Sequence, residues 1–195
     1  MIGARPGRSA IDKRPVGGQV AVGRLGLEGD ECADKQDHGG VDQALYAYAR
    51  EDLDWWTEGL ARELPSGVFG ENITTAGIEV SAALIGETWQ LGTAVVQVTS
   101  PRIPCATFQS WLDEPHWVKR FAAAGRPGAY LRVLTDGEVW AGAELTVLTR
   151  PEVAVTVTES MLAFYGDREI MLRLMEVEGR GHKWDEFGPA VLNRV

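Results

Sequence analysis

One segment places a thiol and a cation at the end of an apolar run. In Ser100–Cys105, two prolines stiffen the turn, Arg102 lies three residues before Cys105, and a predicted helix follows. A thiol at a helix N-terminus lies at the positive end of the helix dipole, and a nearby guanidinium adds a second positive charge. Both favour the thiolate, which attacks electrophiles and binds soft metals. The alternative is a packed core cysteine, because unpaired cysteine is among the most often buried residue types.

Further candidate groups lie in two glycine-rich stretches, Gly26–Asp30 and His38–Asp42. Glycine lets the backbone approach a ligand closely and direct its N–H groups at an anion. The side chains of Asp30, His38 and Asp42 are suited to hydrogen-bond a heterocycle or to move a proton. The competing interpretation is a turn-rich loop with solvated acids.

Two short motifs carry polar groups that suit a ligand. Asn72 follows Phe69-Gly70-Glu71 just before a predicted strand, and its amide offers two donors and an acceptor to the edge of a heterocycle. Lys13 and Arg14 form a basic pair that fits a phosphate. The alternatives are a turn-closing hydrogen bond for Asn72 and simple surface solvation for the basic pair.

Several other chemistries lack their motifs. The chain has no Gly-x-Gly-x-x-Gly, Walker A, His-Glu-x-x-His or Gly-x-Ser-x-Gly pattern, so dinucleotide-binding folds, zinc proteases and serine hydrolases are not favoured. Cys32 lies in an acidic stretch, is not spaced to join a zinc site, and is assigned no role.

Composition excludes further classes. The 19 basic and 28 acidic residues give a net charge of −9, whereas a duplex nucleic-acid binder needs a cationic surplus, so we expect no nucleic-acid partner. No apolar run approaches the ~20 residues of a membrane helix, and the N-terminal stretch has no secretory apolar region. We therefore expect a cytoplasmic protein with no membrane partner.

Hydrophobic periodicity predicts the elements that must position these residues. Alternating or apolar runs indicate strands at 19–23, 43–49, 73–75, 88–91, 93–100, 128–134, 138–140 and 144–149. Helical spacing indicates helices at 50–62, 107–114 and 115–124. Asp136-Gly137 predicts a type I′ hairpin between two of the strands. Many short strands at close spacing favour a β-barrel over a βαβ sheet.

After Arg150 the pattern changes from strands to helices. Helix-like segments at 158–165, 167–177 and 182–193 are separated by glycines. We expect an α+β fold that is mainly β, with a barrel domain at 9–150 and a C-terminal helical appendage at 155–195. Deleting everything after Arg150 is expected to leave a folded barrel.

In their order along the chain, these motifs resemble the MOSC domain, a family named for the C-terminal domain of molybdenum-cofactor sulfurase. The motifs are Lys-Arg-Pro-Val, Gly-Leu-x-Gly-Asp, His-Gly-Gly-x-Asp, Gly-x-Phe-Gly-Glu-Asn and Pro-Arg-x-Pro-Cys. The helical tail is similar to the three-helix extension of a bacterial branch linked to resistance to N-hydroxylated purines. The resemblance implies a MOSC-type β-barrel that binds the molybdenum cofactor, molybdopterin.

The resemblance also implies roles for single residues. Cys105 matches the cysteine whose thiolate coordinates molybdenum, and Lys13 resembles the lysine near the cofactor phosphate. Asn72 matches an asparagine that faces the pterin, and Gly39 and Gly40 belong to a pocket-lining motif.

One position departs from the family pattern. The amidoxime-reducing relatives carry an arginine two places before the matching asparagine, where this chain has Gly70. We therefore expect Arg14 or Arg102 to take over contacts with the cofactor.

The implied activity is reduction of N-hydroxylated compounds, such as hydroxylaminopurines and amidoximes, to amines. His38, Asp30 or Asp42 would supply the proton. No flavin, haem or iron–sulfur motif is visible, so a separate reductase, a flavoprotein or an iron–sulfur protein, would supply electrons.

The alternative is a carrier, with a persulfide on Cys105 or with molybdenum cofactor held for delivery. Pyridoxal phosphate binding is associated with the family as a whole. We expect no fused pyridoxal-phosphate-dependent sulfurase domain, which would favour the carrier. The oligomeric state stays open.

Overall fold

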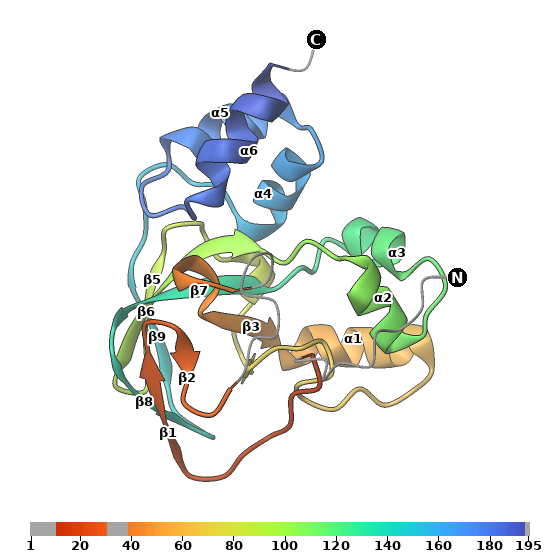
Figure 1. The fold of residues 1–195 in the computed structure, drawn as a ribbon, viewed down its shortest axis with the longest axis vertical. Coiled ribbons are helices and arrows are strands. Elements are labelled where there is room, and N and C mark those ends of the chain that lie inside the picture. Colours follow the sequence, from red (N-terminus) through yellow and green to blue (C-terminus); the bar gives the residue numbers. More distant parts are fainter. Residues whose placement is uncertain (1–10, 31–38, 194–195) are drawn as a thin grey trace.

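Two sheets of short strands form the body of the protein (Figure 1). This computed structural model describes residues 11–30 and 39–193. Its six-stranded sheet has the order β4-β3-β7-β6-β5-β9, and its three-stranded sheet has the order β2-β1-β8. The strands are β1 (Gln19–Gly23), β2 (Gly26–Leu27), β3 (Leu45–Ala49), β4 (Ile73–Thr75), β5 (Thr88–Leu91), β6 (Ala94–Pro101), β7 (Ala129–Thr135), β8 (Gly137–Trp140) and β9 (Leu145–Thr149). The larger sheet curls into a half-barrel, which confirms the predicted fold class.

The long antiparallel strands β6 and β7 lie in the middle of the larger sheet. Val96 of β6 lies opposite Val133 of β7. Val98 in turn lies opposite Leu131. All four side chains are buried in the larger core. Because successive strand residues point to opposite faces, the alternating valines that predicted β6 also decide which face is buried.

Strand β3 is buried on both faces, because a core lies on each side of it. Leu45 and Ala47 belong to the larger core, whereas Tyr46 and Tyr48 belong to a second, aromatic core. Helix α1 (Arg50–Leu60) connects β3 to β4, which pairs with it in parallel. Parallel neighbours require such a crossover, so one βαβ unit is built into a sheet that the sequence predicted as a barrel.

The prediction of a β-hairpin at Asp136-Gly137 is wrong. Strand β7 pairs with β3 and β6, whereas β8 pairs with β1 in the smaller sheet. Gly137 lacks the positive φ of a type I′ turn, and a β-carbon there would lie 2.5 Å from the Ala94 nitrogen. The glycine therefore permits a close approach to the β5–β6 turn. Sequence alone does not distinguish a glycine in a type I′ turn from a glycine at a close backbone contact, because both positions favour a residue without a side chain.

The aromatic core fixes the start of the helix that follows Cys105. It is enclosed by α1, α2 (Ala106–Leu112) and α3 (Trp117–Ala124). The Phe108 ring centroid lies 5.2 Å from that of Phe69 and 5.5 Å from that of Trp117, both edge-on. Such edge-to-face contacts add to the free energy of burial, so α2 is held firmly against the sheet.

Three C-terminal helices lie at one end of the sheet (Figure 1): α4 (Val157–Phe164), α5 (Arg168–Glu176) and α6 (Lys183–Leu192). Thr156 and Glu159 form a capping box at α4, and the Asp167 carboxylate accepts a bond from Ile170 N at α5. These caps satisfy backbone N–H groups that otherwise lack partners at helix starts. The predicted helices are confirmed to within two residues.

The same helices complete the larger core. Val157, Met171 and Trp184 are buried in one cluster with the strand residues of the half-barrel. The division at 9–150 and 155–195 stays a prediction. Two short 3-10 turns, η1 (Val41–Gln43) and η2 (Val80–Ala82), join the elements. Within the described ranges, no helix has the length and apolar character that crossing a membrane requires.

Candidate functional site

Lys13, Asp30 and Asn72, three residues predicted to belong to the functional site, lie together at a cavity of about 950 Å³. Lys13 forms an ion pair with Asp30, and Asn72 Nδ2 donates to the other Asp30 oxygen at 2.9 Å. Asn72 Oδ1 accepts a bond of 2.8 Å from the Tyr46 backbone N–H. All three side chains line the cavity or its rim, so the fold orders a cation, a carboxylate and an amide on one wall.

The buried carboxylate of Glu71 stabilises the loop that carries Asn72. Glu71 accepts bonds from the backbone N–H of Gly67 at 2.6 Å and of Phe69 at 2.9 Å. Burial raises the pKa of Glu71, although these hydrogen bonds oppose the rise. Gly67 has φ +91°, and a β-carbon there would lie 2.4 Å from the Lys13 carbonyl oxygen. The glycine thus lets the segment of Lys13 lie against this loop.

Arg14 lines the same cavity but is held more loosely. Its side chain is 82% exposed and pairs with Asp12 at 3.1 Å. An exposed pair of this kind contributes little to stability, so the guanidinium can turn toward an anion at small cost.

Cys105 caps the N-terminus of α2 and is half-buried against the aromatic core. The predicted placement of the thiol at a helix start is therefore confirmed. Within the described ranges, Cys105 lines neither this cavity nor a smaller one beside the C-terminal helices.

Arg102 is buried and, within the described ranges, lines neither cavity. It donates to the Phe69 carbonyl at 2.6 Å, and its guanidinium carbon lies 4.1 Å from the Phe108 ring centroid. Burial lowers the pKa of Arg102. The electrostatic effect of the nearby Tyr130, Tyr46, Cys105 and Glu71 outweighs burial, so the net shift of the pKa is upward. Arg102 is thus a fixed cation close to Cys105 and the Glu71 loop.

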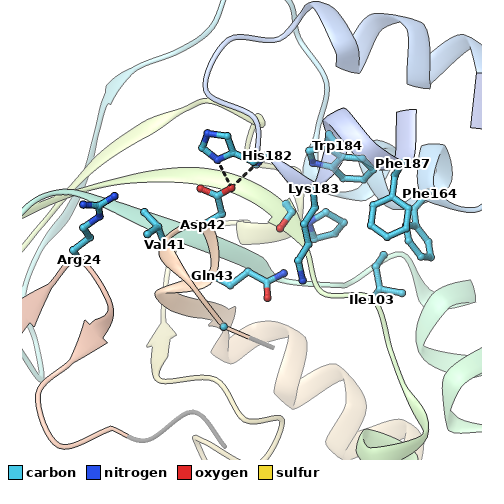
Figure 2. A pocket seen from close by; sticks show the side chains of 14 residues that line it. Arg24, Val41, Asp42, Gln43, Ile103, Phe164, His182, Lys183, Trp184 and Phe187 are labelled. Atoms are coloured by element: carbon cyan, nitrogen blue, oxygen red, sulfur yellow. Dashed lines mark hydrogen bonds and ion pairs between the residues drawn. The ribbon is translucent and has the colours of Figure 1, made fainter. Parts of the chain in front are cut away.

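The smaller cavity, of about 320 Å³, lies between the half-barrel and the C-terminal helices (Figure 2). Its walls come from the η1 segment, the end of β6 with the residues after it, and α4 and α6. The predicted residues Gly39 and Asp42 line it, whereas Gly40, with φ +92°, does not. His38 lies outside the described residues.

Asp42 joins the half-barrel to the loop before α6 (Figure 2). One carboxylate oxygen accepts bonds from Arg132 at 2.6 and 2.8 Å. The other accepts from the His182 backbone N–H at 2.6 Å and lies 2.8 Å from His182 Nδ1. Burial raises the pKa of Asp42, but the bonds from His182 and Arg132 outweigh it and lower the pKa. Asp42 is therefore ionised at neutral pH and accepts hydrogen bonds rather than releasing a proton.

The structure adds three residues that the sequence did not single out: Glu71, Gln43 and His182. The Glu71 position inside a motif was an available signal. Gln43 directly follows the predicted residue Asp42, whereas His182 gave no signal, because it is 140 positions from its partner Asp42. Within the described part of the chain, no group of three or more His, Cys, Asp or Glu side chains could hold a metal ion on its own.

Comparisons with known proteins point to one family. The sequence model described as the MOSC domain matches residues 34–146. The chain is 33% identical over 185 residues to "Protein YiiM" of Escherichia coli, covering 90% of this chain and 81% of that protein. It is 39% identical over 149 residues to "Uncharacterized protein YflK" of Bacillus subtilis, covering 76% and 67%.

A third relative is much longer than this chain. The chain is 33% identical over 147 residues to a protein named "Reductase" from Gibberella moniliformis, covering 73% of this chain but only 26% of that protein.

Solved structures agree with these matches. The crystal structure of YiiM from Geobacillus stearothermophilus has a TM-score of 0.81 at 31% identity, covering 93% of this chain and 88% of that one. The Escherichia coli YiiM structure has a TM-score of 0.78 at 28% identity, covering 91% and 86%.

Proposed function

This chain belongs to the MOSC domain family, and from that membership we propose that it is an oxidoreductase that uses the molybdenum cofactor to reduce N-hydroxylated compounds to amines. The family and the relative named "Reductase" support the broader oxidoreductase assignment. The cofactor and the substrate are the part that we propose.

One observation carries the proposal. Lys13, Asp30 and Asn72 belong to distant segments, yet an ion pair and a hydrogen bond join them at one large cavity. The family resemblance associates Lys13 with the phosphate and Asn72 with the pterin.

The residues that line the larger cavity fit the phosphate and the pterin of such a cofactor. A volume of about 950 Å³ is at the upper end of the range for small-molecule and cofactor sites. Lys13 and Arg14 would bind the phosphate, and Asn72 the polar edge of the pterin. The buried Thr75 hydroxyl, which also lines the cavity, has no hydrogen-bond partner among the described residues and would gain one.

Cys105 would supply a thiolate ligand to molybdenum, since soft sulfur donors suit a metal already bound by sulfur. When bound, the cofactor supplies an oxygen-accepting metal that exchanges two electrons; the protein supplies binding, orientation and electrostatics. Arg102 stays charged beside the thiol and favours its ionised form. The Glu71 loop keeps Asn72 in place.

Protons and electrons have different sources in this proposal. Asp42 is an ionised hydrogen-bond acceptor and is therefore not suited to release a proton at neutral pH, and Asp30 is held in the ion pair with Lys13. We therefore retain His38 as the proposed proton donor. Electrons would come from a separate flavoprotein or iron–sulfur reductase, and the net charge of −9 favours docking of a basic partner.

The test is expression of the full chain in a host that makes molybdenum cofactor. We expect the purified protein to contain molybdenum and pterin, and to reduce benzamidoxime to benzamidine with reduced methyl viologen as the electron donor. Cys105→Ser is expected to abolish this activity while the far-UV circular dichroism and melting temperature stay close to those of the parent, because the thiol is half-buried.

Other results would contradict the proposal. A mutant that loses its fold would show that Cys105 serves packing. Retained cofactor without turnover would favour the carrier alternative. A preparation with neither metal nor pterin would exclude both.

A further inference from the structure

We propose that the electron-donor protein docks on an exposed aromatic surface of the C-terminal helices, beside the smaller cavity, and that this donor is a reductase whose docking surface is basic around an apolar centre. We call this surface the helical patch. It consists of Leu162 and Phe164 of α4, Tyr165 directly after α4, and Phe187 of α6. The inference rests on the proposed function and specifies where its redox partner binds.

The four side chains of the helical patch form one apolar surface. Leu162 and Tyr165 lie three positions apart, on the same side of the α4 segment, and are 46% and 51% exposed. The Phe164 ring centroid lies 5.4 Å from that of Tyr165 and 5.2 Å from that of Phe187, which is 40% exposed. Exposed contiguous apolar surface with a polar rim marks interaction sites, and aromatic residues are enriched at the centre of interfaces.

The helical patch lies next to the segment that carries the proposed metal ligand. Phe164 and Phe187 line the smaller cavity together with Ile103, and Figure 2 shows these three side chains near one another. Cys105 follows Ile103 by two residues, which span at most about 7 Å of chain. Because the rate of electron transfer falls steeply with distance, a donor must bring its own cofactor close to the metal. A donor bound on the helical patch meets this requirement.

The charge of the C-terminal helices favours a basic partner. Residues 151–193 include eight acidic and four basic residues. Glu169 and Glu186 are exposed, and each lies within four positions of a residue of the helical patch. The basic Lys183 lines the smaller cavity. An acidic rim around an apolar centre attracts a basic docking surface, steers the encounter of the two proteins and fixes their orientation.

The size of the helical patch suits a partner that binds and leaves in each catalytic cycle. Electron-transfer complexes bury less than about 1,200 Å² in total, whereas permanent dimers bury more and have more apolar interfaces. A few exposed apolar side chains with an acidic rim therefore match a transient redox complex better than a permanent interface between two copies of this chain.

Turnover with two electron donors tests the docking surface. The cofactor-loaded full-length protein is assayed for benzamidoxime reduction, first with NADPH and ferredoxin–NADP⁺ reductase, a flavoprotein with a basic docking face, and then with reduced methyl viologen, which needs no docking surface. The double variant Leu162→Ala/Tyr165→Ala is expected to raise the KM for the reductase about tenfold. The rate with methyl viologen should stay that of the parent, because neither side chain lines a described cavity.

A charge variant tests the acidic rim. Glu169→Lys/Glu186→Lys is expected to raise the KM for the reductase about fivefold at low ionic strength and to flatten its dependence on salt. Surface plasmon resonance with the reductase as the probe measures the same changes in affinity without turnover.

Two matched controls lie outside the helical patch. Leu148→Ala removes a leucine of β9 that is 49% exposed, and Glu58→Lys reverses an exposed charge on α1. Both variants should bind and use the reductase like the parent. Thermal melts check that every variant is folded.

The outcomes separate this inference from the proposed function. Parent-like reductase affinity and KM in the folded patch variants, or no reductase binding by the parent, would overturn the docking surface while turnover with methyl viologen keeps the proposed function. A dimer of the parent that dissociates in Leu162→Ala/Tyr165→Ala would show that a second copy covers the helical patch, and would also overturn it. Patch-dependent reductase binding without turnover from either donor would support the docking surface and overturn the proposed function.

Discussion

At the scale of single residues, the partner of each charged group decides what it can do. Asp30 and Asp42 are both acids from glycine-rich stretches, and the sequence gives them the same candidate role. In the fold, Asp30 joins Lys13 to Asn72 at the larger cavity, whereas Asp42 is surrounded by donors at the smaller one. Neither is left as an isolated acid, so we assign both to positioning.

A charge reversal at Lys13 tests whether this residue binds the phosphate of the cofactor. Lys13→Glu replaces an ion pair with two facing carboxylates and reverses the charge at the cavity wall. We expect pterin content per protein to fall about tenfold. The measurement is pterin fluorescence after release from protein purified from a cofactor-producing host.

Lys119→Glu is the control for this charge reversal, because Lys119 is an exposed residue of α3. It should leave pterin content unchanged. Full pterin retention in Lys13→Glu would remove Lys13 from the phosphate site.

At the scale of elements, the contact between η1 and the loop before α6 depends on one carboxylate. Asp42→Asn replaces an anion that accepts from Arg132 and His182 with a neutral amide. Charge-assisted hydrogen bonds of this kind each contribute a few kcal/mol, so we expect the free energy of unfolding to fall by about 2 kcal/mol. Urea denaturation measures the loss.

The same carboxylate predicts a pH dependence with a definite sign. The fold lowers the pKa of Asp42 from 3.8, so its contribution to stability is complete above that value and is lost as the pH falls through the lower pKa of the folded state. Between neutral pH and about pH 3, the parent should therefore lose more stability than Asp42→Asn. Identical losses in the two proteins would show that Asp42 does not stabilise the fold.

At the scale of the whole molecule, the C-terminal helices and the half-barrel share one core. The Val157 backbone N–H donates to the Ala83 carbonyl, and Ile85 N–H donates to the Val155 carbonyl, each at 2.9 Å. Val155 and Val157 are fully buried in the same cluster as Ile85. The helices therefore cover apolar surface that the strands would otherwise expose.

This arrangement changes the outcome expected for a truncated chain. The sequence pattern predicts that residues up to Arg150 fold alone. Because removal of the helices uncovers the larger core, we instead expect a chain ending at Arg150 to aggregate or to melt well below the parent. Size-exclusion chromatography and thermal melts measure this. A monodisperse product with a melting temperature near that of the parent would show that the half-barrel folds without the helices.

Most of the elements could be predicted from the sequence, because burial repeats along a single element. The alternating valines of β6 and the apolar spacing of α1 place both elements to within two residues. Strand β2, with two residues, is too short to show a period and could not be predicted. The ordered motifs likewise indicated the family before any geometry was known.

The tertiary structure alone decided which residues meet. The periodicity of a strand tells which side is buried but not which strand lies beside it, so β8 was predicted to pair with β7 and instead pairs with β1. Likewise, nothing in the sequence near Asp42 points to His182. Pairing partners depend on the packing of distant segments, and that packing is settled by the burial of the whole core rather than by any local pattern.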